Sequence, residues 1–187
     1  MVENQADLPA DHWDVITQRL DEMEQFVEEM RDYMTLVEQD EHEFEPVSLR
    51  PTLEEQVALV QNAHENATLL VEELPDTTVL ADELLGHVFR NLLRNAVEHN
   101  DKDTPKVHVS AERTSETVTV TIADNGPGIP DEHKETIRER GVQIDESTGS
   151  GFGLHLVTEA VNAYNGDLQI QDNEPEGTKV QVTLPTV

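Results

Sequence analysis

The stretch DNGPGIP at residues 124–130 follows a segment in which Val118, Val120 and Ile122 alternate with threonine and alanine. This alternation has the period of a half-buried strand. The strand ends at Asp124, and the glycines and prolines that follow predict a turn in which main chain could lie close to a ligand. A plain glycine-rich turn capped by the aspartate also fits this stretch when it is taken alone.

Two further motifs flank the turn. Upstream, NLLRNAVEHND (91–101) lies in a run from Ala81 with apolar residues at helical spacing, and Asn91 and Asn95 are four positions apart, so they share one helix face. Downstream, GSGFGLHLV (149–157) is a glycine-rich loop that leads into a helix. Backbone amides and the helix dipole favour an anion at such a junction. Its spacing fits neither the Walker pattern nor the dinucleotide fingerprint.

In this order the three motifs resemble the N box and the two glycine boxes of one ATP-binding module. Histidine kinases, gyrase-type topoisomerases, the large heat-shock chaperone and mismatch-repair ATPases share that module. The likeness is strongest to the catalytic, ATP-binding domain of sensor histidine kinases and covers roughly residues 45–187, including a final hairpin with a Gly-Thr pair at 164–185. It implies a two-layer α/β sandwich.

The periodicity of the chain predicts the same class, α+β, with three helices on one face of a mixed, mostly antiparallel sheet. We expect Thr52 to begin the first helix and Asp82 to cap the second. The expected helices cover 52–63, about 81–101 and the segment from 152, and the expected strands cover 45–51, 67–73, 78–81, 107–113 and 118–124.

The composition is strongly acidic, with 40 Asp and Glu against 12 Lys and Arg and a net charge of −28. Such a chain repels phosphate backbones, so nucleic acid is excluded as a partner. It is typical of a halophile, for example a haloarchaeon, because molar salt shortens the Debye length to about 3 Å. The chain has no cysteine and no apolar run long enough to span a membrane. We therefore expect a soluble, cytoplasmic domain, whose parent protein could be membrane-attached.

We divide the chain into a lead-in at 1–10, a long helix at 11–40 and an ATP-binding domain at 41–187. In the helix, apolar residues alternate steps of three and four from Trp13 to Val37, which is a heptad seam. The seam favours packing on another long helix, although an amphipathic helix lying on its own domain also fits. By resemblance the segment is the second helix of a histidine kinase hairpin, and two copies could form a homodimer through it.

None of the eight histidines has the context of a histidine kinase phosphoacceptor, which is a His followed by an acidic residue and a basic-polar-Pro run. Either the chain is the C-terminal part of a longer sensor or it does not phosphorylate itself on histidine. We favour the first, because a single second helix leaves its apolar seam without a partner in the same chain.

The resemblance implies Mg²⁺ and ATP as cofactors, with Asn95 as the metal ligand. An amide oxygen suits Mg²⁺, which completes its shell with water and phosphate. Asn91 stands where the gyrase and chaperone branches carry a Glu that serves as general base. Because an amide is not basic at neutral pH, Asn91 argues against hydrolysis and for phosphoryl transfer to a protein.

Asp124 corresponds to the family's acceptor for the adenine amine, and His99 to a phosphate donor, although His99 could simply end its helix. Residues 131–150 are expected to form a lid without the usual Phe-containing box, where an arginine meets phosphate or only solvent. The expected catalytic residues are Asn91, Asn95 and His99. The expected ATP-binding residues are Asn95, Glu98, His99, Asp124, Gly126, Gly128, Ile129, Arg138, Arg140, Gly149, Ser150, Gly151, Phe152, Gly153, Leu154 and Thr178.

The sequence thus predicts the ATP-binding domain of a two-component histidine kinase. In this hypothesis it transfers the γ-phosphoryl group to a histidine on a helix that this chain lacks, and a response regulator receives the group next. One alternative is a nucleotide-binding adaptor without phosphotransfer. Another is a serine/threonine kinase of the anti-sigma-factor type, which Asn91 and the heptad helix disfavour.

Overall fold

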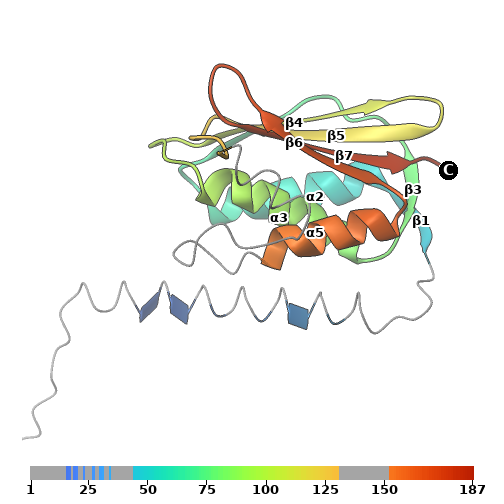
Figure 1. Cartoon of the computed structure of the whole chain (residues 1–187), viewed down its shortest axis with the longest axis horizontal. Helices are drawn as coiled ribbons and strands as arrows, with labels where there is room; N and C mark the ends of the chain where they lie inside the picture. The colour runs from blue at the N-terminus through green and yellow to red at the C-terminus, as the bar shows by residue number, and fades with distance from the viewer. Residues whose placement is uncertain are drawn as a thin grey trace, which may run out of the picture.

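The computed structural model describes residues 44–130 and 152–187 of the chain. It also describes separate helical positions near the N-terminus, namely Ile16, Thr17, Arg19, Leu20, Met23, Val27, Met30, Arg31 and Met34. Within the two described ranges the chain forms two layers, a sheet on one side and helices on the other (Figure 1). The predicted lead-in at 1–10 and the predicted lid at 131–150 lie outside the described residues.

The strands are β1 (Glu45–Ser48), β2 (Thr68–Val71), β3 (Thr78–Ala81), β4 (Lys106–Arg113), β5 (Thr117–Asp124), β6 (Asp167–Asp172) and β7 (Thr178–Pro185). Five of them form one sheet in the order β2-β4-β5-β7-β6, and β1 pairs with β3 in a separate small sheet. Only β2 and β4 are parallel among these pairs. The sheet is therefore mixed and mostly antiparallel, as predicted.

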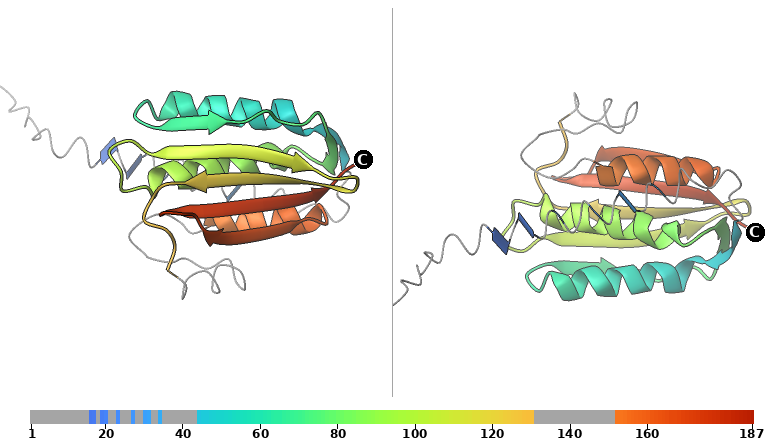
Figure 2. Two further views of the ribbon diagram at one scale, coloured as in Figure 1. Left: turned by 90° about the horizontal axis from the view of Figure 1, so that it is seen from above. Right: turned by 90° about the horizontal axis from the view of Figure 1, so that it is seen from below.

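The described helices are α2 (Leu49–Ala63), α3 (Leu84–Glu98) and α5 (Phe152–Ala163). All three cover one face of the large sheet, with α3 between α2 and α5 (Figure 2). Strand residues that alternate toward the helices are fully buried, for example Val109, Val120 and Leu184. Phe89 of α3 is fully buried against them. The α+β class and the three-helix layer are confirmed.

One local prediction was wrong. The first helix begins at Leu49 and not at Thr52, since Pro51 is tolerated in the first helical turn; Thr52 is inside the helix and its hydroxyl donates to the Ser48 carbonyl at 3.0 Å. The strands β2 and β3, on either side of Pro75, do not pair with each other, because β2 pairs with β4 and β3 pairs with β1. Pairing over long separations leaves no trace in local periodicity.

Other local predictions were confirmed. β6 and β7 form the predicted hairpin at the end of the chain, and β4 and β5 form another. Asp82 caps α3, because its Oδ1 atom accepts a hydrogen bond from the Leu84 N–H at 3.0 Å. The same carboxylate accepts a hydrogen bond from the Tyr164 hydroxyl, which joins the start of α3 to the end of α5.

The N-terminal positions that the structure describes are helical. Five of the predicted seam residues have 40–65% of their surface exposed: Ile16, Leu20, Met23, Val27 and Met34. Trp13 and Val37 lie outside the described residues, and the division at residues 11–40 stays a prediction. In the part of the chain that is described, no helix combines the length and apolar character needed to cross a membrane.

Candidate functional site

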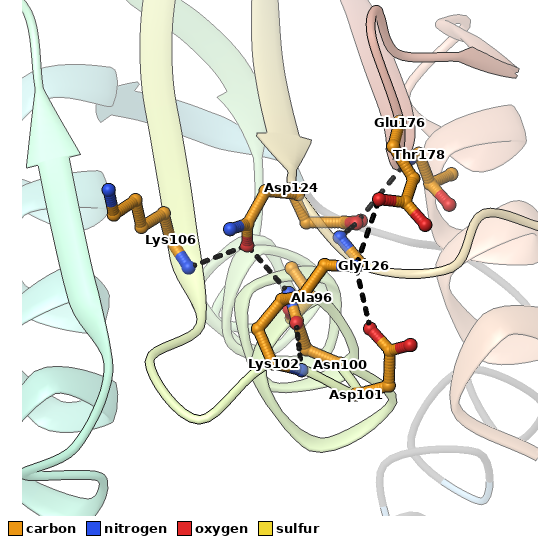
Figure 3. Close-up of polar contacts among 10 residues, drawn as sticks. Ala96, Asn100, Asp101, Lys102, Lys106, Asp124, Gly126, Glu176 and Thr178 are labelled. Carbon is orange, nitrogen blue, oxygen red and sulfur yellow. Dashed lines mark hydrogen bonds and ion pairs between the residues drawn. The ribbon is translucent and has the colours of Figure 1, made fainter.

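Asp124 is the last residue of β5, and its side chain lies where β5 ends beside the start of β7 (Figure 3). Its Oδ1 atom accepts hydrogen bonds from the backbone N–H of Gly126 at 2.8 Å and of Thr178 at 3.1 Å. Its backbone carbonyl accepts a bond from Asn173 Nδ2 at 2.7 Å. Among the described residues no hydrogen bond reaches Oδ2, so a fixed carboxylate keeps one acceptor oxygen for a ligand.

Burial raises the pKa of Asp124, and the two backbone hydrogen bonds to its carboxylate oppose that shift. The ionised form therefore lacks part of the hydration that an exposed carboxylate has. A ligand N–H group that reaches Oδ2 replaces this missing hydration. Such an acceptor selects for a hydrogen-bond donor at one position of the ligand.

Backbone approach at this point requires glycine. Gly177 has a φ angle of +125°, and a Cβ atom there would lie 2.0 Å from the Asp124 carbonyl oxygen. A Cβ at Gly126 would lie 3.1 Å from Asp124 Oδ1 and 3.3 Å from the Asn100 amide carbon. The turn between β6 and β7 and the loop after β5 thus touch through their main chains.

Asn91 lies buried in α3, with 3% of its surface exposed. Its Nδ2 donates to the His87 carbonyl at 3.1 Å, and its Oδ1 accepts from Arg94 Nη2 at 2.9 Å. Both ends of the amide are used inside α3. Asn91 therefore orients Arg94, while its predicted role at a reacting phosphate stays untested.

Asn95 lies one helical turn later and is half-buried. No hydrogen bond from any described residue engages its side chain. Its amide oxygen is free to face a ligand, and this residue type fits the predicted Mg²⁺, which uses few protein ligands together with phosphate and water oxygens. Within the described ranges, no three His, Asp or Glu side chains are grouped to hold a metal ion.

The two residues after the last buried turn of α3 are exposed. Glu98 lies 3.6 Å from Arg94 Nε and 3.7 Å from His64 Nε2, which connects α3 to the end of α2. His99 follows the helix, and its backbone N–H donates to the Asn95 carbonyl at 3.1 Å. This turn therefore presents an amide, a carboxylate and an imidazole close together in sequence.

A hydrogen-bonded link joins these two groups of residues (Figure 3). Asn125 Oδ1 accepts from Asn100 Nδ2 at 3.0 Å and from the Lys106 N–H at 2.8 Å. Lys102 Nζ forms an ion pair with Glu176 at 2.9 Å and with Asp101 at 3.3 Å. The end of α3 is thus tied both to the loop after β5 and to the turn before β7.

The structure brings together six of the predicted ATP-binding residues at the adjoining ends of β5, β7 and α3: Asp124, Gly126, Thr178, Asn95, Glu98 and His99. Gly128 and Ile129 continue the loop after β5. Gly153 is buried in α5, where Leu154 packs against the core. The other predicted residues lie outside the described part of the chain: Arg138, Arg140, Gly149, Ser150, Gly151 and the side chain of Phe152.

Sequence reasoning missed Asn100, Asn125, Asn173 and Lys102. Asn100 and Asn125 are 25 positions apart, and Asn173 and Asp124 are 49 positions apart. No spacing rule connects residues at such distances. Asn100 and Asn125 lie inside the motifs at 91–101 and 124–130, so their amide side chains were a signal that could have found those two.

A mixed sheet covered by helices on one face, with a held carboxylate at a strand end, fits the ATP-binding class that the sequence predicted. Residues 81–187 match the family model for histidine kinase-, DNA gyrase B- and HSP90-like ATPases, and the chain belongs to this family. The adaptive-response sensory kinase SasA of Synechocystis is 33% identical over 149 residues, which are 75% of this chain and 38% of that protein. The sensor protein kinase WalK of Staphylococcus epidermidis is 32% identical over 66% of this chain and 22% of that protein.

Solved structures agree. The catalytic domain of the histidine kinase ThkA superposes with a TM-score of 0.68 at 25% identity, covering 77% of this chain and 96% of that chain. ThkA in complex with the response regulator protein TrrA gives a TM-score of 0.74 at 22% identity, covering 98% of this chain and 53% of that chain. The chain is thus an ATP-binding domain of the histidine kinase type and spans well under half the length of SasA and WalK.

Proposed function

We propose that the chain binds Mg²⁺-ATP with the adenine amine on Asp124 Oδ2. The observation that carries this proposal is the fixed carboxylate, which has one oxygen on two backbone N–H groups and the other without a partner among the described residues. Adenine offers an N–H donor at its 6-position, whereas guanine and hypoxanthine offer a carbonyl oxygen there. A carbonyl facing Oδ2 leaves both acceptors unpaired, which costs roughly 1–3 kcal/mol.

The triphosphate lies toward the end of α3 in this proposal. Asn95 holds the Mg²⁺ ion, which supplies positive charge to the phosphate oxygens. His99, and Arg138 or Arg140 from the predicted lid, donate to phosphate. A chain with a net charge of −28 attracts no phosphate by its overall field, so such local donors are needed.

The reaction is transfer of the γ-phosphoryl group to a histidine of a longer parent chain. An imidazole nitrogen attacks phosphorus, the bond to the β,γ-bridging oxygen breaks, ADP leaves, and the imidazole loses its proton. Asn91 supports transfer over hydrolysis, because its amide is not basic and is already bonded to His87 and Arg94. The kinase names of SasA, WalK and ThkA support the same reaction class.

The wider assembly follows from the sequence and from the relatives. We infer a homodimer through residues 11–40, a histidine-bearing helix elsewhere in the parent chain, and a response regulator as the next acceptor, as the complex of ThkA with TrrA suggests. The charge of −28 further supports a halophilic, cytoplasmic setting with molar salt.

Isothermal titration calorimetry in molar KCl tests the base assignment. ATP and inosine triphosphate (ITP) differ at the 6-position of the base, so we expect ATP to bind at least about tenfold more tightly. Equal affinity for the two nucleotides would contradict the role of Asp124. A protein that binds neither nucleotide would overturn the proposed function.

Phosphotransfer is tested separately with radiolabelled ATP and the helix hairpin of a related histidine kinase. Acid-labile, base-stable label on the hairpin is expected, because a phosphorylated histidine has that stability. ATP binding without any transfer, to this hairpin or within the parent chain, would favour the adaptor. Acid-stable label on serine or threonine would favour the kinase of the anti-sigma-factor type.

A further inference from the structure

The side chain of Asn125 connects two segments that carry the two ends of the proposed nucleotide site. Its Oδ1 atom accepts one hydrogen bond from Asn100, just after α3, and one from the backbone of Lys106 at the start of β4. Asn100 in turn accepts from the Lys102 N–H at 3.1 Å, and its Nδ2 lies 3.4 Å from the Ala96 carbonyl. The side chain of Asn125 thus ties the loop after β5 to the residues that follow α3.

We propose that Asn125 is a positioning residue that fixes the metal-binding end of α3 relative to the base-binding end of β5. The inference rests on the proposed Mg²⁺-ATP function. Asn125 itself contacts neither the base nor the metal in the proposed Mg²⁺-ATP complex. It sets the distance between Asp124 and Asn95, so that one nucleotide can meet both at once.

The base contact does not depend on this link. Asp124 Oδ1 is held by the Gly126 and Thr178 N–H groups, and its carbonyl is held by Asn173. Two of these three donors come from the turn before β7 and from β7 itself. Loss of the Asn125 side chain therefore leaves the carboxylate in place.

The end of α3 has fewer other restraints. Val97 is buried and anchors the helix in the core, but Glu98 and His99 after it are exposed. The connection from the end of α3 to the turn before β7 is the ion pair of Lys102 with Glu176, which is exposed and is screened strongly in molar salt. The bond between the two neutral amides of Asn100 and Asn125 is not weakened in this way. It is the link expected to persist at the salt concentration where an acidic chain works.

The test compares two affinities for each variant by calorimetry in molar KCl. One is the affinity for adenosine, which reports the base contact alone. The other is the ratio of ATP affinity with Mg²⁺ to ATP affinity in EDTA, which reports the metal end. Asn125→Leu removes the acceptor, Asn100→Asp removes the donor from the opposite side, and Asn125→Asp keeps an acceptor for both donors. Asn162→Leu, on the exposed side of α5, is the matched control.

We expect Asn125→Leu and Asn100→Asp to lower the Mg²⁺-dependent ratio by about tenfold while adenosine binding stays within about twofold. Asn125→Asp and Asn162→Leu should keep the ratio of the wild type. A ratio that is unchanged in both Asn125→Leu and Asn100→Asp would overturn the inference. So would a parallel loss of adenosine binding, because that outcome indicates a general collapse of the loop.

The wild-type protein separates this inference from the proposed function. If wild type binds adenosine and shows a Mg²⁺-dependent gain for ATP, the proposed site stands and the variants decide the role of Asn125. If wild type shows no binding or no gain, the proposed function itself is wrong.

Discussion

The two ends of the candidate nucleotide site are built in different ways. At the base end, Asp124 receives hydrogen bonds from its own loop and from β7, 54 positions away, and the glycines around it allow main chains to touch. At the metal end, Asn95, Glu98 and His99 lie within the five residues 95–99 of one helix terminus, where Asn95 is half-buried and the other two are exposed. The base end is held by tertiary contacts, and the metal end mainly by helix geometry.

This difference indicates what each end contributes to nucleotide binding. A carboxylate that is already oriented loses little entropy when a base arrives, so selectivity is preformed there. The side chains at the end of α3 have to be ordered by the metal and the phosphates when the nucleotide binds. Variants at the base end should therefore change stability and base preference, whereas variants at the metal end should change only the response to Mg²⁺.

The largest expected effect is that of Gly177→Ala on stability. Its Cβ would lie 2.0 Å from the Asp124 carbonyl in a backbone conformation with a φ of +125°, so we expect a loss of at least about 3 kcal/mol in the free energy of unfolding. Urea denaturation in molar KCl measures it. Gly86→Ala is the control, because its Cβ meets only side-chain atoms, of Gln56 at 3.3 Å and of Thr52 at 3.9 Å, and helix propensity favours alanine by about 1 kcal/mol. Similar losses for the two variants would show that the base end is not tightly packed.

Asp124→Asn should reverse the base preference. The new amide has one oxygen, which the Gly126 and Thr178 N–H groups engage, so its NH₂ group faces the ligand. ATP affinity should fall by about 100-fold, since two donors then face each other, and ITP should bind better than ATP because its 6-carbonyl can accept. Calorimetry with both nucleotides measures the change, with the exposed Asp103→Asn as control. Retention of the ATP preference would place the base elsewhere.

Asn95→Ala should act on the metal end alone. We expect the Mg²⁺-dependent gain in ATP affinity to fall by about tenfold while adenosine affinity is unchanged, because one oxygen ligand is lost. Asn91→Ala is the comparison, since it removes an amide that is bonded inside α3 and should lower stability by about 1 kcal/mol. If Asn91→Ala instead abolished the Mg²⁺ gain and left stability unchanged, Asn91 would be the metal ligand.

The pH dependence of adenosine affinity tests the carboxylate at the base end of the site. Burial raises the pKa of Asp124, and only its ionised form accepts from the adenine amine through Oδ2, so affinity is present above this pKa and is lost as pH falls through it. The loss should begin at a higher pH than an ordinary aspartate would cause. Because its pKa is raised in the folded state, Asp124 binds its proton more tightly in the folded than in the unfolded protein. This difference stabilises the fold at low pH, and the stabilisation is lost as the pH rises through the pKa of the folded state. Adenosine is the ligand for calorimetry because it has no titrating phosphate, and Asp124→Asn should remove the pH dependence between neutral and mildly acidic pH.

The smallest effect is expected for Lys102→Gln. Its ammonium is exposed, and the Glu176 and Asp101 carboxylates raise its pKa, so the ion pair persists at neutral pH. In low salt the melting temperature should fall slightly, and in molar KCl the difference should vanish. Thermal unfolding at both salt concentrations measures this. A loss that survived molar salt would mean that the ion pair, and not the Asn100–Asn125 bond, is the main cross-connection.

Much of the fold could be predicted from local patterns. The alternation of Val118, Val120 and Ile122 located β5, and the apolar spacing along the Asn-bearing run located α3, because burial of one face imposes a period on the sequence. The partner of β2 could not be predicted, since a parallel pair joins segments that no turn connects. The start of α2 was misplaced because a strand and a helix meet there at Ser48 and Leu49 without a gap.

Local sequence patterns located the candidate site, with an aspartate at a strand end, glycines after it, and two asparagines on one helix face. Helix and strand periods make these properties local. The packing of distant segments was needed to show that Asn91 is buried while Asn95 is half-buried, and that the second donor to Asp124 comes from Thr178. Both features depend on which segments pack together, and packing is set by the burial of the whole core.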